Sequence, residues 1–160
     1  MMKPLFLFFL SFFVLTGSPA LLHAEENTSS VHVEAPYAFA TAAGQKMGAV
    51  FLTLKNEGNE EDRLLSAASD VAETVQIHEN KIDEETGVMQ MREISGIAVP
   101  AQGEEVLKPA GNHIMLMGLK DVLDVGKQFT VTLTFEKAGE ISVPVTVIPS
   151  GAKPGHHGHE

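Results

Sequence analysis

Residues 111–119, Gly-Asn-His-Ile-Met-Leu-Met-Gly-Leu, combine the pattern of a β-strand with side chains that can bind a metal ion. In an extended chain, successive side chains point to opposite faces. His113, Met115 and Met117 therefore share one face, and aliphatic side chains occupy the other. An imidazole and two thioethers in a row are a poor choice for core packing. They are a reasonable donor set for a soft metal ion.

A second cluster of the same residue types lies upstream, where His78 is followed by Met89 and Met91. The two methionines are two residues apart, so they share a face if their segment is extended. Of the five methionines beyond Met1 and Met2, four lie in these two short stretches. This grouping indicates a shared role.

Four of these side chains, His78, Met91, His113 and Met115, supply two imidazoles and two thioethers. Such a set favours Cu(I) over Zn(II), because a thioether is a soft and weak ligand for zinc. Calcium and magnesium require oxygen ligands. The chain contains no cysteine, so a blue-copper centre is excluded.

Packing is the alternative explanation for each of these residues taken singly. Methionine often fills gaps in a core, and an isolated histidine near a strand is more often structural than a ligand. Met89 and Met117 are further candidate ligands, although Met89 by itself is better explained by packing or by a place at the rim.

The C-terminal tail, residues 150–160, carries a third group of potential ligands. His156, His157 and His159 lie close together between glycines. Imidazoles at this spacing can bind Cu(II) or Zn(II) in a flexible segment. The alternative is a solvated tail without a role.

The elements that must position the two main clusters are short strands. Alternating or β-rich segments separated by turn residues predict strands at 31–33, 48–55, 63–68, 72–78, 88–94, 97–100, 105–107, 113–119, 128–136 and 140–148. Residues 79–87 predict a hairpin-like excursion. Residues 35–38, which include Pro36, predict a strand end or bend, and residues 119–126 a short helical turn or a loop. Many short strands at this spacing predict an all-β sandwich or barrel.

Composition narrows the classes of function. The chain has 160 residues, enough for one domain with a core, and a formal net charge of −10. Nucleic acid and anionic membrane surfaces are therefore unfavourable partners. Without cysteine there is no disulfide, thiolate metal site or cysteine nucleophile. No Gly-x-Ser-x-Gly motif supports a hydrolase built around His113 and a carboxylate.

The N-terminus predicts export. Lys3 precedes an apolar run over residues 5–15, which is too short to span a bilayer. Small residues follow, so the segment has the pattern of a secretory signal peptide, residues 1–24, with Ala20 as the second choice for the cleavage site. We expect one domain over residues 25–149, in the periplasm, without stable membrane insertion after cleavage.

The spacing of the candidate ligands resembles the pattern of the PCuAC family of periplasmic copper chaperones. That pattern is a histidine, a methionine after a short interval, twenty-one residues, and then His-x-Met. His78, Met91 and the segment from His113 to Met115 match it, with twenty-one residues between Met91 and His113. The surrounding sequence is also similar, at residues 49–54, 62–64, 77–79, 87–92, 113–119 and 133–136. The likeness extends from about Val31 to Val147.

The resemblance implies a cupredoxin-like Greek-key β-sandwich that binds Cu(I). It also implies delivery of the copper to the copper centre of a respiratory cytochrome oxidase. We expect a monomer that is not an enzyme, with the apo copper domain of such an oxidase or another copper chaperone as its partner. Three alternatives stay open at this stage. They are a periplasmic protein that sequesters copper for metal tolerance, a hydrolase, and a secreted structural sandwich whose methionines only pack.

Overall fold

The structure of the protein is a computed structural model, and it describes residues 30–153. The predicted signal peptide and the tail histidines His156, His157 and His159 lie outside the described residues. No helix of the described part is long and apolar enough to cross a membrane.

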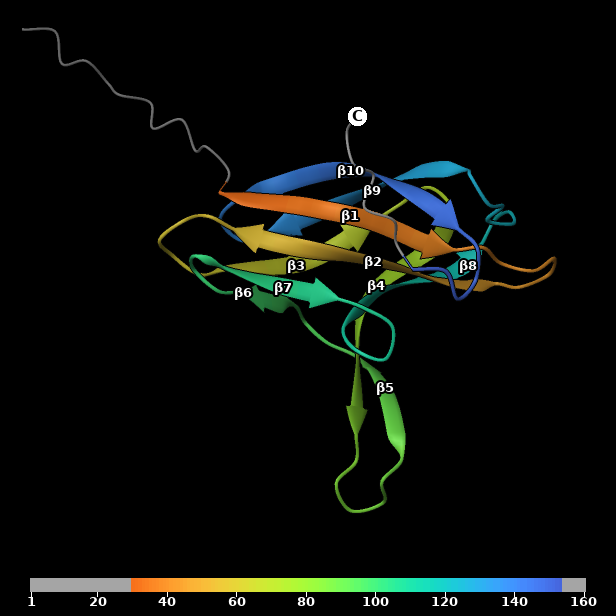
Figure 1. Cartoon of the computed structure of the whole chain (residues 1–160), viewed down its shortest axis with the longest axis horizontal. Helices are drawn as coiled ribbons and strands as arrows, with labels where there is room; N and C mark the ends of the chain where they lie inside the picture. The colour runs from red at the N-terminus through yellow and green to blue at the C-terminus, as the bar shows by residue number, and fades with distance from the viewer. Residues whose placement is uncertain (1–29, 154–160) are drawn as a thin grey trace, which may run out of the picture.

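Strands form the whole of the regular structure between residues 30 and 153 (Figure 1). They are β1 (Val31–Phe39), β2 (Met47–Asn56), β3 (Asp62–Ala68), β4 (Ala72–Ile82), β5 (Met89–Glu93), β6 (Ile97–Val99), β7 (Gly103–Leu107), β8 (His113–Leu119), β9 (Gln128–Phe135) and β10 (Gly139–Ile148). Most of them correspond to segments in which β-branched and other apolar residues recur, as a half-buried strand requires. β5 is the exception, because all five of its residues are exposed. The predicted all-β class is confirmed.

The strands follow the order β5-β4-β8-β2-β1-β10-β9-β3-β6, with β7 paired to β2. Neighbours in this order are mostly distant in sequence, as in a Greek key. Side chains of β2 and β8 share one apolar core with those of β9, β3 and β6, at the other end of the order. The hydrogen-bonded ladder therefore folds back on itself to give two layers, and the predicted β-sandwich is confirmed.

The sequence predicts a strand end or a bend at residues 35–38, and the first strand excludes the strand end. Residues 35–38 do not end β1, which continues to Phe39. Its register with β2 shifts between Glu34 and Tyr37, and Ala35 has a φ of 46°. Pro36 has no N–H to donate to the ladder, so the chain bulges there and then pairs again. Residues 120–127, by contrast, contain no helix and form a loop.

The strand that carries His113 lies inside the sheet, between β4 and β2. Its alternation is as predicted: Ile114 and Leu116 are both fully buried in the core. The predicted excursion at 79–87 belongs to the β4–β5 hairpin: residues 79–82 continue β4 and residues 83–88 form the turn. This hairpin projects from the body of the sandwich in Figure 1. The fold thus joins a fixed inner strand to a projecting arm.

Burial of the aliphatic face of β8 should control the stability of the whole domain. Truncation of fully buried Leu116 to alanine leaves a cavity, so Leu116→Ala should lower the free energy of unfolding by about 2–5 kcal/mol in a denaturant titration. Leu65→Ala is the matched control, because Leu65 is 43% exposed. The control should change the free energy by less than about 0.5 kcal/mol. Equal effects would contradict this account of β8.

Candidate metal site

The pairing of β4 with β8 brings the two predicted histidines together. His78 lies directly opposite His113 in the antiparallel register, so both rings lie on the same face of the sheet. Their ring centroids are 5.9 Å apart and the rings are inclined at 62°. Met115, two residues along β8 on the same face, is 7% exposed, and His113 is 3% exposed. Three predicted donors therefore form one cluster on the face away from the core.

The pairing of β4 with β5 adds Met91. Met91 lies opposite Asn80, which follows His78 by two residues and so shares its face. Met91 is therefore a diagonal neighbour of His78, and its side chain is 52% exposed. Met89 pairs with Ile82, which places it about 7 Å farther along the hairpin. The geometry favours Met91 over Met89 as the fourth donor.

Met117 is separated from this cluster. It lies four residues beyond His113, about 13 Å along an extended strand. Its partner across the β2–β8 ladder is Met47. Because side chains stand roughly perpendicular to a sheet, Met117 is not placed to share a metal ion with the two histidines.

Hydrogen bonds set the tautomers of both imidazoles. His78 Nε2 lies 2.9 Å from the Gln76 Oε1 oxygen, and His113 Nδ1 lies 3.0 Å from the Gly111 carbonyl oxygen. These oxygens accept, so the two ring nitrogens carry the protons and donate. The lone pairs then lie on His78 Nδ1 and His113 Nε2. Among the described side chains, His78 Nδ1 is the one buried nitrogen or oxygen without a hydrogen-bond partner, a property expected of a metal ligand before loading.

A carboxylate supports the orientation of His78 through an amide. Gln76 Nε2 donates to Glu93 Oε2 at 2.9 Å, while the oxygen of the same amide accepts from His78. Burial lowers the pKa of His78, the neighbouring His113 lowers it further, and the charge of Glu93 raises it in part. His78 is thus biased toward the neutral form, the only form that binds a metal.

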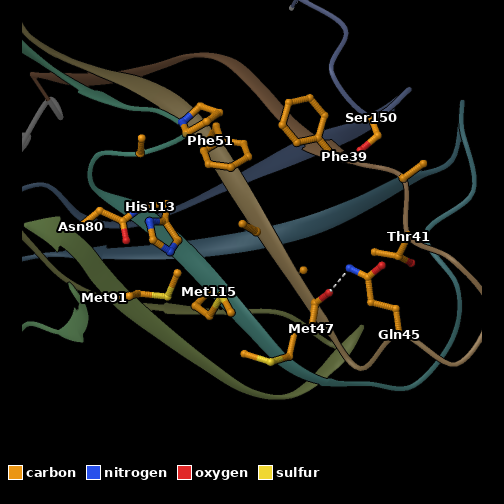
Figure 2. Close-up of a pocket in the computed structure, with 15 residues that line it drawn as sticks. Phe39, Thr41, Gln45, Met47, Phe51, Asn80, Met91, His113, Met115 and Ser150 are labelled. Carbon is orange, nitrogen blue, oxygen red and sulfur yellow. Dashed lines mark hydrogen bonds between the residues drawn. The ribbon is translucent and has the colours of Figure 1, made fainter. Parts of the chain in front are cut away.

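An open hollow lies beside the donors. It has a volume of about 450 Å³, and Figure 2 shows His113, Met91 and Met115 directed toward one another at its side. Phe51 packs 6.3 Å from the His113 ring, centroid to centroid, and Phe39 packs on Phe51 at 5.6 Å. The apolar walls lower the local dielectric constant around the donors and shield them from water on one side.

Only two types of side chain in this cluster can bind a metal ion, histidine and methionine. Within residues 30–153, no three histidine, aspartate or glutamate side chains are grouped as a metal site. The cluster offers at most two imidazole nitrogens and two thioether sulfurs. This donor set suits a soft monovalent ion.

Three residues near the donors are absent from the sequence-based prediction. Gln76 and Asn80 flank His78 at positions i−2 and i+2, so strand periodicity could have placed them on the donor face. Met47 is the one of the five methionines beyond Met2 that lies outside the two clusters, and only the register of β2 with β8 brings it to this face. No signal within the sequence around Met47 indicates that position.

The chain belongs to the LpqE-like family, described as "Putative lipoprotein LpqE-like". The family matches residues 31–147. One relative is "Putative lipoprotein Lxx21020" of Leifsonia xyli subsp. xyli (strain CTCB07), which is 36% identical over 149 residues. That match covers 90% of this chain and 89% of the relative.

Solved structures of PCuAC domains share the fold, which confirms the family resemblance. The apo PCuAC domain from PmoF1 is 25% identical with a TM-score of 0.64, over 75% of this chain and 94% of that domain. The Cu(I) form of DR1885 from Deinococcus radiodurans is 25% identical with a TM-score of 0.59, over 79% of this chain and 85% of that protein.

The pKa of His78 generates a testable prediction. An NMR pH titration of the metal-free protein should give a His78 midpoint below 6.5, since burial disfavours the imidazolium. As the pH falls, His78 of the unfolded chain is protonated before His78 of the folded protein. The stability associated with neutral His78 is therefore complete above about 6.5 and decreases as the pH falls toward the folded-state pKa.

Glu93→Gln is the matched variant for this titration. Glu93 raises the His78 pKa through its charge, so its removal should move the midpoint lower still. A His78 midpoint at or above 6.5 in the unmodified protein would contradict the role of burial.

Proposed function

We propose that this protein binds one Cu(I) ion through His78, Met91, His113 and Met115 and transfers it to a copper-dependent acceptor outside the cytoplasm. The observation that carries the proposal is the hydrogen bond from one ring nitrogen of each histidine to an oxygen. In both rings this nitrogen donates its proton to the oxygen, so the other ring nitrogen retains its lone pair. The register of β4, β5 and β8 adds two thioethers on the same face.

The related proteins support the choice of metal. The structure of DR1885 was determined with Cu(I), and that of a PCuAC domain from PmoF2 with copper. DR1885 shares the fold of this chain at 25% identity. On this basis we propose Cu(I) as cargo and a binding function rather than catalysis.

Unequal exposure of the donors supports transfer rather than storage. His113 and Met115 are almost completely buried, whereas Met91 on the projecting hairpin is 52% exposed. An acceptor's ligand can replace the exposed thioether first and the buried donors afterwards, without unfolding of the domain. The formal charge of −10 favours an acceptor with a basic or neutral face.

The proposed acceptor is the apo copper domain of a respiratory cytochrome oxidase or another copper chaperone. The predicted signal peptide and the description of the Leifsonia relative as a "Putative lipoprotein" support a location outside the cytoplasm. Binding of Cu(II) by His156, His157 and His159 in the tail stays a prediction. The rival function is copper sequestration. Burial of His113 and Met115 supports it, because buried donors would slow the release of copper.

The choice of Met91 is tested by two matched substitutions. Met91→Leu retains volume and apolar character but removes the sulfur, so the fold should persist. Cu(I) affinity, measured against a competing chelator, should fall about tenfold or more, which corresponds to about 1.4 kcal/mol.

Met89→Leu is the control, because Met89 is also 52% exposed and lies on the same hairpin. It should leave the Cu(I) affinity within about twofold, or about 0.4 kcal/mol. A larger loss from Met89→Leu than from Met91→Leu would show that the donor assignment is wrong.

Transfer is tested with the Cu(I)-loaded protein and an apo copper domain of an oxidase that binds Cu(I) more tightly. Copper should appear on the acceptor within minutes, more slowly at high salt if charge steers the encounter. His113→Ala should abolish both loading and transfer, with an unfolding curve to confirm that the variant folds. Full retention of copper for hours beside the tighter acceptor would establish sequestration instead.

A further inference from the structure

Met47 and Met117 form a thioether pair that the proposed Cu(I) site does not use. We infer that this pair is a second, weaker subsite for a soft monovalent ion, Cu(I) or Ag(I). The proposal goes beyond the proposed function because the two donors are different from those of the main site.

The register places the two thioethers side by side. Met47 on β2 pairs directly with Met117 on β8, and facing residues of antiparallel strands have Cβ atoms about 4.5–5.5 Å apart. Both lie on the donor face, since the core residues Val50 and Ile114 occupy the alternate positions of the same strands. Two flexible side chains at this distance can bring both sulfurs to one ion.

Hydrogen bonds fix the backbone on both sides of Met47. The Gln45 side chain donates from Nε2 to the Met47 carbonyl oxygen at 2.7 Å (Figure 2). The Leu119 N–H donates to the Lys46 carbonyl oxygen at 3.0 Å. The start of β2 is thereby tied to the end of β8, so the two methionines keep their pairing although Met47 is the first residue of its strand.

Packing does not account for Met47. Its side chain is 48% exposed and lines the open hollow beside the proposed copper site. A half-exposed thioether at the edge of a hollow is accessible to an ion from solvent. The sulfur of a methionine is a soft ligand, which selects Cu(I) over the divalent ions that prefer oxygen or nitrogen.

The position of the pair suggests its use. Met115 lies midway between His113 and Met117 along β8, two residues or about 7 Å from each. The thioethers of Met117 and Met115 therefore follow one another along β8 toward His113, and Met91 joins them from the β4–β5 hairpin. An ion captured at the pair has a route of soft donors to the main site.

The test uses the full chain labelled with ¹³C at the methionine methyl groups, assigned with single Met→Leu variants, and titrated with Ag(I). The methyl signals report on thioethers alone, so silver bound by the tail histidines produces no methyl shift, and the equivalents are counted as silver bound at thioethers. The first equivalent should shift Met91 and Met115. The second should shift Met47 and Met117 together, with one common dissociation constant.

Disruption of the pair provides the decisive comparison. In Met47→Leu, the Met117 signal should no longer move at the second equivalent, and the reverse should hold in Met117→Leu. Either variant should leave the response to the first equivalent unchanged. A Met117 signal that still moves in Met47→Leu would overturn the proposal.

Met89 is the control for unspecific binding of silver to a single exposed thioether, since its exposure of 52% is close to the 48% of Met47 and its partner is Ile82. The Met89 methyl signal should not shift at the second equivalent. Equal responses of Met89 and Met47 would overturn the proposal. If the first equivalent does not shift the methyl signals of Met91 and Met115, the proposed function is wrong. The second subsite would still be tested by the signals of Met47 and Met117.

Discussion

The direct pairing of His78 with His113 across β4 and β8 is the constraint on which the rest of the site depends. Side chains alternate along a strand with a period of two, so a shift of one residue in this register would place one imidazole in the core. The register is fixed on the opposite face, where Ile114 and Leu116 are fully buried. Core packing on one side of β8 therefore determines the donor geometry on the other.

Because side chains alternate between the two faces of the sheet, burial has a different role on each face. On the core face, apolar side chains from both layers provide the stability of the sandwich. On the donor face, Phe51 packs beside His113 and Phe39 packs on Phe51, so aromatic side chains restrict access of water to His113 from this side. His113 is consequently covered by a small aromatic cluster rather than by the main core, and the cost of burying the polar rings is subtracted from the stability that the core provides.

Much of the fold could be predicted from the sequence because its strands are short, alternating and separated by turn residues. The positions of His113 and Met115 on a strand face followed from the same periodicity. The bulge at Ala35 could not be predicted, because the presence of Pro36 fits either an end or an irregularity of a strand, and only the renewed pairing of Tyr37 with β2 decides between them. The position of Met47 beside Met117 also could not be predicted, because it depends on the pairing of β2 with β8, which are far apart in the sequence.

The order of strands has a consequence for local opening. β5 is at the end of the order and pairs only with β4, whereas β8 has a strand on each side. A fluctuation that detaches β5 would carry Met91 away and leave His113 and Met115 in place, because edge elements open at lower free energy than the core. An ion bound to both halves would act as a clip across the hairpin and suppress that fluctuation. Amide hydrogen exchange in β5 would then be slow in the loaded protein and fast in the empty one, so the arm itself would report whether the cargo is present.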